Sequence, residues 1–376
     1  MYADAVPPVA AFECPACHRH LTGDITQPLC PDCSAPLLVR YHAAAFAGAA
    51  KPAAAAPPSI ARYAQLLPDS APLTLPTGWT PLLPSRRHPH LLVKNEAANP
   101  ASSFHARGIS VAVAVALHSG HRRIVAAAAG DEAVALAVYA SAAGLQAHLI
   151  MPRADTSGYS EALACGATLT LLDDTPAACT RHAAEDARRD RSLSFPLLDP
   201  FRIEGAKTLG LEIVEQLGWR YPQAIFCPLD DAILIGLWKA FHELEELGWV
   251  AGHRPKIIAI RTTVSAPQHA DFLLREIIHP SGGRIMDLPD NAWQASLLDW
   301  ARHEGILLCP HGAAAAAAWQ QAREESLLTG NAPAVLIQPA SGIRHLGVIA
   351  ETMGLAAPAA KIYPQRTPVG GIITPQ

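Results

Sequence analysis

Four cysteines near the N-terminus have the spacing of a metal site. Cys14, Cys17, Cys30 and Cys33 form two C-x-x-C pairs within FECPACHRHLTGDITQPLCPDCSAPLLVRY. Each pair directs two thiolates to one point, and four thiolates suit tetrahedral Zn²⁺. Such a zinc is structural, because four protein ligands leave no open position for water or substrate. Disulfide bonds are the alternative, which a reducing compartment disfavours. We therefore predict a zinc-ribbon-like four-cysteine module over residues 1–42.

The composition excludes several classes of partner. The chain has 376 residues, half of them hydrophobic, and a formal net charge of -4 without an extended basic region. Such a chain has room for more than one lobe, but it lacks the positive field that attracts nucleic acid or anionic membranes. The N-terminus has no signal-peptide pattern, and the apolar runs are too short to span a bilayer. We expect a cytoplasmic protein that binds neither nucleic acid nor membrane.

The strands and helices that position the remaining candidate residues begin after a short linker. Residues 43–58, AAAFAGAAKPAAAAPP, are biased to Ala and Pro and predict this linker. Apolar strands then alternate with helical patterns through residues 59–376. We expect strands at 91–96, 122–129, 146–152, 167–173, 224–229, 256–262 and 333–339, and helices at 109–120, 132–144, 160–166, 204–219, 236–249 and 310–328. This order predicts an α/β fold whose mostly parallel sheets are covered by helices on both faces.

Several stretches resemble threonine synthases, which are fold type II (tryptophan synthase β-like) pyridoxal-phosphate enzymes. They occur in the family's order: TGWTPLLPS, LLVKNEAANPASSFHARG, DPFRIEGAKTLGLEIVEQLGW, IGLWKAFHEL and CPHGAAAAAAW. The resemblance runs from the cysteine module to about Glu351. It implies a two-lobed, three-layer parallel-sheet fold, with the smaller lobe at about residues 90–200. It also implies pyridoxal phosphate bound between the lobes, replacement chemistry of the lyase family on an amino acid, and a homodimer.

His105 stands where this family has its Schiff-base lysine. The family's N-P-T-G-S-F-K-D-R-G appears as NPASSFHARG. A Schiff base requires a primary amine, which imidazole does not provide, although imidazole moves protons near neutral pH. Lysine occurs only at positions 51, 94, 207, 239, 256 and 361, none of them in a comparable setting. Ser103 and Arg107 keep the family's residue types, and we expect them to hold the shape of the loop.

Three further segments that contact the cofactor in the family have changed. The glycine-rich phosphate cup G-G-G-T-G is replaced within CPLDDAILIGLW, where Asp230 and Asp231 bring negative charge to the phosphate position. The S-S-G-N-A-G loop appears as AAGDEA, where Asp131 replaces an Asn and is an acceptor only. In PASGIRH, Pro339 replaces the Thr that bonds the pyridine nitrogen, and Ser341 persists. These residues predict a degenerate cofactor pocket.

The losses predict a pseudoenzyme that keeps a structural zinc and lacks pyridoxal phosphate. It would bind a small amine or amino-acid-like ligand, or a protein partner, as a homodimer or with an active paralogue. One alternative is a cofactor-independent enzyme that uses His105 with Asp131 as acid and base. Another is surviving pyridoxal-phosphate-dependent threonine synthase activity. For single residues, we expect His105 to fill the pocket with a hydrogen bond to a neighbour, and the aspartates to be exposed loop carboxylates rather than ligands of a cation or amine.

Overall fold

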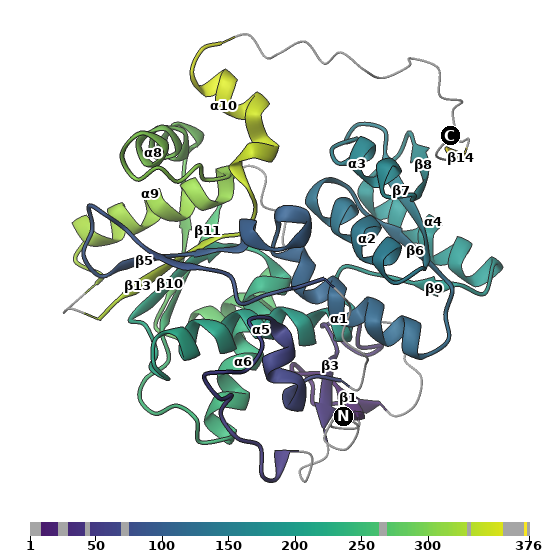
Figure 1. Ribbon diagram of the computed structural model, residues 1–376, viewed down its shortest axis with the longest axis horizontal. Coiled ribbons are helices and arrows are strands. Elements are labelled where there is room, and N and C mark those ends of the chain that lie inside the picture. The colour runs from purple at the N-terminus through teal and green to yellow at the C-terminus, as the bar shows by residue number, and fades with distance from the viewer. Residues whose placement is uncertain are drawn as a thin grey trace. The chain divides into compact units, whose positions relative to one another are not determined.

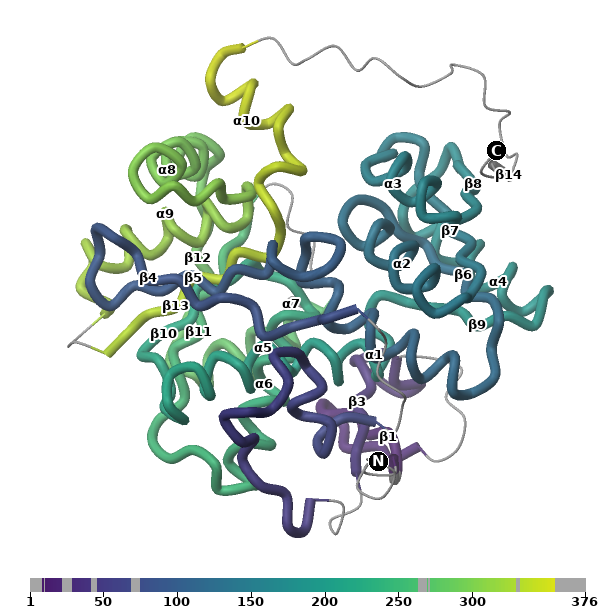
Figure 2. The backbone as a smooth tube through the Cα atoms, viewed as in Figure 1, coloured from purple at the N-terminus to yellow at the C-terminus, as the bar shows by residue number. Residues whose placement is uncertain are grey.

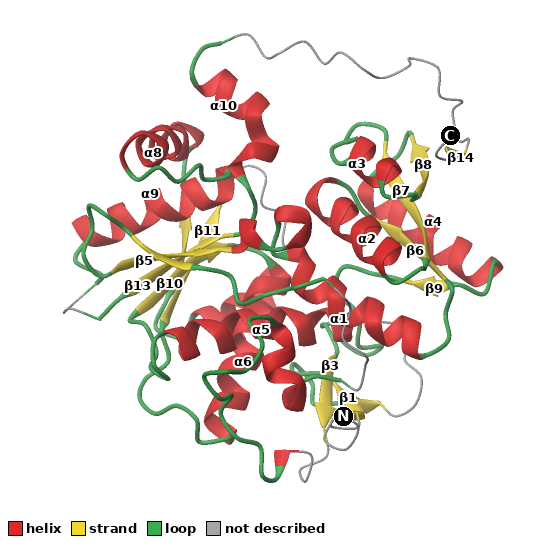
Figure 3. Ribbon diagram, in the orientation of Figure 1, coloured by secondary structure: helices red, strands yellow, loops and turns green. Residues whose placement is uncertain are grey.

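The computed structural model describes residues 9–21, 29–41, 46–68, 75–262, 269–328, 332–355 and 372–373 (Figure 1). The chain divides into two compact units. Unit 1 comprises Met1–Gly78, Asn99–Ala206 and Tyr363–Gln376, and unit 2 comprises Trp79–Ala98 and Lys207–Ile362. Each unit contains its own parallel sheet with helices, so the predicted α/β class is confirmed (Figure 3). The boundaries that we place at residues 42 and 58 stay a prediction.

The N-terminal part of unit 1 is a small antiparallel sheet in the order β2-β1-β3. Its strands are β1 (Val9–Glu13), β2 (His20–Leu21) and β3 (Leu38–Tyr41). Among the described residues, only six buried ones form its core: Phe12, Cys14, Cys30, Ala35, Leu37 and Val39. A core of this size is too small to stabilise the module without a metal or another cross-link. In the predicted linker, residues 47–58 contain neither helix nor strand, and 43–45 lie outside the described residues.

The larger sheet of unit 1 has the order β14-β8-β7-β6-β9 (Figure 2). The strands β6 (Arg123–Ala127), β7 (Gln146–Pro152), β8 (Thr168–Leu172) and β9 (Leu193–Ser194) are parallel, and β14 (Ile372–Ile373) is antiparallel. Alternate residues of β6 face opposite layers, as the two-residue period of a strand requires. Ile124 and Ala126 pack with α1 (His105–His118), α2 (Gly130–Ala142) and α3 (Tyr159–Ala164), whereas Val125 packs with α4 (Pro176–Arg189).

Unit 2 is built on a six-stranded sheet in the order β12-β11-β10-β13-β5-β4. The strands β5 (Leu91–Asn95), β10 (Ala224–Pro228), β11 (Lys256–Arg261), β12 (Arg284–Asp287) and β13 (Ala334–Gln338) are parallel, and the edge strand β4 (Leu82–Pro84) is antiparallel. The helices α8 (Asp290–His303) and α9 (Pro310–Glu324) cover one face. Figure 1 shows α6 (Asp231–Glu246) on the other face.

The long helix α5 and several short elements complete the described chain. They are η2 (Ile60–Leu66), η3 (Glu96–Ala98), η4 (Pro100–Ser102), α5 (Pro200–Gln216), α7 (Ala270–Leu273), the π-helix η5 (Leu274–Ile278), η6 (Gly342–His345) and α10 (Leu346–Thr352). The helix α5 contributes its first seven residues to unit 1 and the remainder to unit 2. Among the described residues, no helix is both long and apolar enough to cross a membrane.

Candidate functional site

Each parallel sheet reverses its strand order at one place, and five of the candidate residues follow the strands at these places. In unit 1 the chain proceeds from β6 to β7 and β8 and then adds β9 on the other side of β6. In unit 2 it proceeds from β10 to β11 and β12 and then adds β13 on the other side of β10. Open α/β sheets bind ligands outside the carboxyl ends of the strands at such points. Asp131 follows β6, Asp230 and Asp231 follow β10, and Pro339 and Ser341 follow β13.

His105 is the first residue of α1 and is half-buried. Its ring lies 6.3 Å from the ring of Phe104, measured between centroids. In the part of the chain that the structure describes, the imidazole makes neither a hydrogen bond nor an ion pair. The expected hydrogen bond to a neighbour is therefore absent from these residues.

The residues that flank His105 fix helix α1 against the start of α5. The side chains of Ser103 and Arg107 are buried, and within the described residues the Ser103 hydroxyl has no hydrogen-bond partner. A Cβ atom added at Gly205 would lie 2.1 Å from the Arg107 carbonyl oxygen, and one added at Gly108 would lie 2.6 Å from that of Arg202. The two helices thus cross with their backbones in contact. This contact accounts for the glycines in the HARG and IEG stretches.

The loop after β6 places Asp131 in the first turn of α2. The N-cap residue Ala129 provides no side-chain hydrogen bond to the helix. The acidic side chains of the first turn interact favourably with the positive end of the helix dipole. The next residue, Glu132, forms an ion pair with Arg202 at 2.6 Å, and both side chains are largely buried. Sequence reasoning missed this pair, because its members are 70 positions apart.

After β10, Asp230 caps its own helix. Its side chain accepts the backbone N–H of Ile233 at 2.8 Å, which uses an amide at the N-terminus of α6. Asp231 is only 4% exposed and accepts the backbone N–H of His269 at 3.2 Å. The Nδ1 atom of His269 lies 3.6 Å from the same carboxylate oxygen. The interpretation of this pair as exposed loop carboxylates is therefore wrong for Asp231, whose neighbour His269 sequence reasoning missed.

The end of β13 leads into a hydrogen-bonded turn. The Ser341 hydroxyl accepts the N–H of Ile343 at 3.3 Å and caps η6, and Ser341 also pairs with Leu308 in a β-bridge. Before half-buried Pro339, the buried side-chain amide of Gln338 bonds, within the described residues, backbone groups alone, including the Ala340 carbonyl at 2.7 Å. These contacts occupy the Ser341 hydroxyl and the Gln338 amide.

The buried lysines of unit 2 are held by carboxylates. The Lys94 ammonium lies 2.8 Å from Glu212, and neither side chain is exposed. Lys207 and Lys239 share Glu243, each at 2.8 Å. Burial by itself raises the pKa of Glu243, but the two ammonium groups lower it more, so its pKa lies below the ordinary value. These lysines are members of structural ion pairs.

The four cysteines of the N-terminal module converge. Their Sγ atoms all lie within 4.8 Å of one another, with 3.4 Å between Cys14 and Cys33 and 3.6 Å between Cys17 and Cys30. Tetrahedral zinc with Zn–S bonds of about 2.3 Å separates its sulfurs by about 3.8 Å, so this donor set fits zinc. All four are free cysteines rather than disulfides.

Two tight turns present these thiols. His18 and Ser34, each one residue after a C-x-x-C pair, have φ values of 58° and 59° and close the turns with bonds to the carbonyls of Cys14 and Cys30. Burial raises the pKa of the Cys30 thiol, but nearby backbone amides and the facing thiols lower it more, to about 7. Amide donors around sulfur stabilise the thiolate form that a metal binds.

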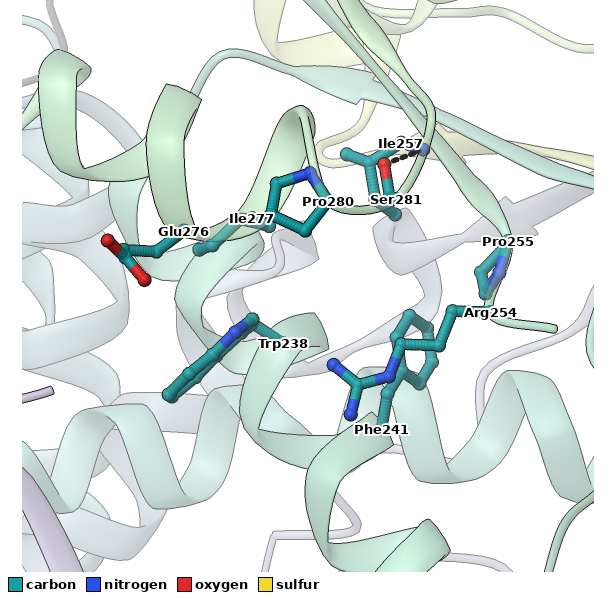
Figure 4. Close-up of a pocket in the computed structure, with 9 residues that line it drawn as sticks. All are labelled: Trp238, Phe241, Arg254, Pro255, Ile257, Glu276, Ile277, Pro280 and Ser281. Carbon is teal, nitrogen blue, oxygen red and sulfur yellow. Dashed lines mark hydrogen bonds between the residues drawn. The ribbon is translucent and has the colours of Figure 1, made fainter.

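A separate small pocket of unit 2 contains none of the predicted site residues (Figure 4). Trp238 and Phe241 of α6, Arg254 before β11 and Glu276 of η5 line it. Its volume is about 50 Å³. Small-molecule sites commonly occupy about 300 Å³ or more, so this pocket is too small for such a ligand.

Comparisons with known proteins agree with the fold. The family model for pyridoxal-phosphate dependent enzymes matches residues 73–339, and the chain belongs to this family. Within it the chain is similar to threonine synthases. The enzyme from Methanosarcina acetivorans is 29% identical over 303 residues, which cover 69% of this chain and 74% of the relative. The threonine synthase from Mycobacterium bovis is 27% identical over 336 residues, which cover 80% of this chain and 92% of the relative.

Solved structures show the same fold. The processed form of threonine deaminase isoform 2 from Solanum lycopersicum superposes with a TM-score of 0.58 at 20% identity and covers 73% of this chain and 88% of its own. An O-ureido-L-serine synthase superposes with a TM-score of 0.60 at 17% identity, and the match covers 72% of this chain and 92% of the synthase chain. The predicted fold type II architecture is thereby confirmed.

Proposed function

We propose that this chain is a pseudoenzyme of the threonine synthase type, which keeps the family's fold and does not use pyridoxal phosphate. The observation that carries the proposal is the half-buried imidazole of His105 at the start of α1, in the position of the Schiff-base lysine. Imidazole supplies no primary amine, so it cannot capture the aldehyde. The buried lysines 94, 207 and 239 do not substitute for it, because each is bound to a carboxylate.

The residues after β10 do not fit the cofactor's phosphate either. A phosphate at a helix N-terminus needs free backbone amides and the positive end of the helix dipole. At α6 the carboxylate of Asp230 already accepts one of these amide N–H groups, and Asp231 adds a second acid, which is buried. A phosphate group carries nearly two negative charges at neutral pH and would be repelled by both.

In place of the cofactor, we propose a small amine or amino-acid-like ligand, or a protein partner that is a second copy or an active paralogue. Asp131 follows β6, the strand at which the sheet of unit 1 reverses its order, and its carboxylate supplies a negative charge for an amine. Acid–base catalysis by His105 has less support, since no carboxylate orients its ring among the described residues. We further propose that the four-cysteine module holds a structural zinc and that the protein acts in the cytoplasm.

A cofactor titration tests the proposal. Wild type, His105→Lys, Asp230→Gly and the double variant are each mixed with stoichiometric pyridoxal phosphate, and visible absorbance of a Schiff base is recorded. We expect no band for wild type and the tightest binding for the double variant, because it gains an amine and frees the α6 amides. His303→Lys, at an exposed side chain, controls for unspecific reaction. A stoichiometric band in wild type would contradict the proposal.

Metal analysis tests the zinc proposal. We expect one zinc per chain after purification and its loss in Cys14→Ser, since three thiolates no longer close the site. The module should then unfold, because binding free energies of structural zinc reach about 10 kcal/mol and are folding free energy. Cys165→Ser, at a cysteine outside the group, is the matched control and should keep the metal. Equal zinc content in both variants would rule out this site.

A further inference from the structure

We infer that the four-cysteine module sets the position of the His105 helix through the first turns of α5, so that metal loading controls the placement of the candidate residues of unit 1. In this role Phe201, Glu204 and Gly205 are positioning residues: none of them is proposed to touch a ligand. The inference goes beyond the proposed function and depends only on the metal proposed for the four thiols.

Two contacts join the module to α5. The rings of Phe12 and Phe201 meet edge to face, with centroids 5.8 Å apart and an interplanar angle of 85°. Phe201 packs against the core of the module and also against the main core of unit 1. The hydroxyl of Tyr41 donates a hydrogen bond to the carboxylate of Glu204, which is fully buried. A buried carboxylate that loses such a donor is strongly destabilised.

The same turns of α5 hold both site segments of unit 1. Gly205 and Gly108 bring the backbones of α5 and α1 into contact two and three residues beyond His105, with no side chain between them to absorb a shift. One turn earlier, Arg202 forms its 2.6 Å ion pair with Glu132, next to Asp131. A displacement of residues 200–206 therefore acts on the start of α1 and on the start of α2.

The module is the two-state element of this arrangement. Its described core is confined to six buried residues, two of them metal-site cysteines, so its folding depends on the metal. When the metal leaves, Phe12 and Tyr41 withdraw from Phe201 and Glu204. The first turns of α5 then lose their outer packing, and the starts of α1 and α2 lose their support.

Hydrogen exchange of the full-length protein, with and without metal, tests this coupling. Removal of zinc by a chelator under reducing conditions should accelerate exchange in the module and, by about ten-fold or more, in residues 105–110, 130–134 and 200–206. Helix α9 should not change. Acceleration confined to residues 9–41 would overturn the inference while leaving the zinc proposal intact, whereas a chain that binds no metal would overturn both.

A variant that keeps the metal separates positioning from folding. The double variant Phe12→Leu, Tyr41→Phe retains all four cysteines, and its zinc content is measured first. The NMR signals of the His105 ring are assigned by their loss in His105→Gln. With zinc bound, we expect these signals to shift from their wild-type positions, whereas the ring signals of His303 should stay fixed. Restoring Tyr41 alone should return part of the shift. Unchanged His105 signals in the zinc-loaded double variant would overturn the inference.

Discussion

Gly205→Ala is expected to lower the free energy of unfolding by about 3 kcal/mol, the upper end of the usual range for overpacked sites. The new Cβ atom would lie 2.1 Å from the Arg107 carbonyl oxygen and 2.7 Å from the Gly108 Cα atom. Both obstacles are backbone, so relief requires α1 and α5 to separate. Denaturant unfolding monitored by circular dichroism measures the effect.

The matched control is Gly347→Ala in helix α10. A Cβ atom at Gly347 meets nothing within 4 Å, and its helical backbone suits alanine. We expect no loss, and at most a gain of about 1 kcal/mol from helix propensity. Equal unfolding midpoints for the two variants would show that the α1–α5 contact does not have the described geometry.

Glu243→Gln is expected to be at least as disruptive, with a loss of about 3–5 kcal/mol, because it leaves two buried ammonium groups without a counter-charge. Both Lys207 and Lys239 lie 2.8 Å from this carboxylate. Its pKa in the fold lies below the ordinary 4.5. The stabilisation is therefore fully present above pH 4.5 and is lost as the pH falls below that value. Denaturant unfolding of both proteins across this pH range measures the effect.

Glu245→Gln is the corresponding control on the same helix. Glu245 pairs with Arg254 at 2.6 Å, but both side chains are partly exposed. Such solvated pairs contribute about 1 kcal/mol or less, so this variant should unfold close to wild type. If Glu243→Gln is equally mild at neutral pH, the two lysines are not held as the ion-pair geometry requires.

Sequence patterns predicted most of the architecture. The strands at 91–96, 146–152 and 224–229 coincide closely with β5, β7 and β10, because each contains a run of at least three apolar residues, as buried parallel strands require. The cysteine spacing likewise predicted a converging group. The helix expected at 236–249 instead begins at Asp231, since Asp230 acts as its cap. Helices α4 and α8 were not predicted: polar residues dominate α4, and mixed patterns weaken the periodicity of α8.

The partners within the candidate site were beyond sequence reasoning. Asp230 and Asp231 were recognised as replacements in a phosphate cup, but the helix cap and the contact with His269 depend on three-dimensional placement. The ion pair of Lys94 and Glu212 joins residues 118 positions apart, and the Tyr41–Glu204 bond joins residues 163 apart. A single sequence contains no signal for such pairings, because hydrogen-bonding capacity does not specify a partner.

The most direct test of the central claim is a search for covalently captured cofactor. Wild-type protein is incubated with stoichiometric pyridoxal phosphate, reduced with borohydride, and examined by intact mass spectrometry and peptide mapping. Borohydride converts any Schiff base into a stable secondary amine, so even a minor adduct is retained. The pseudoenzyme account predicts unmodified protein, whereas a stoichiometric adduct at one specific lysine would contradict it.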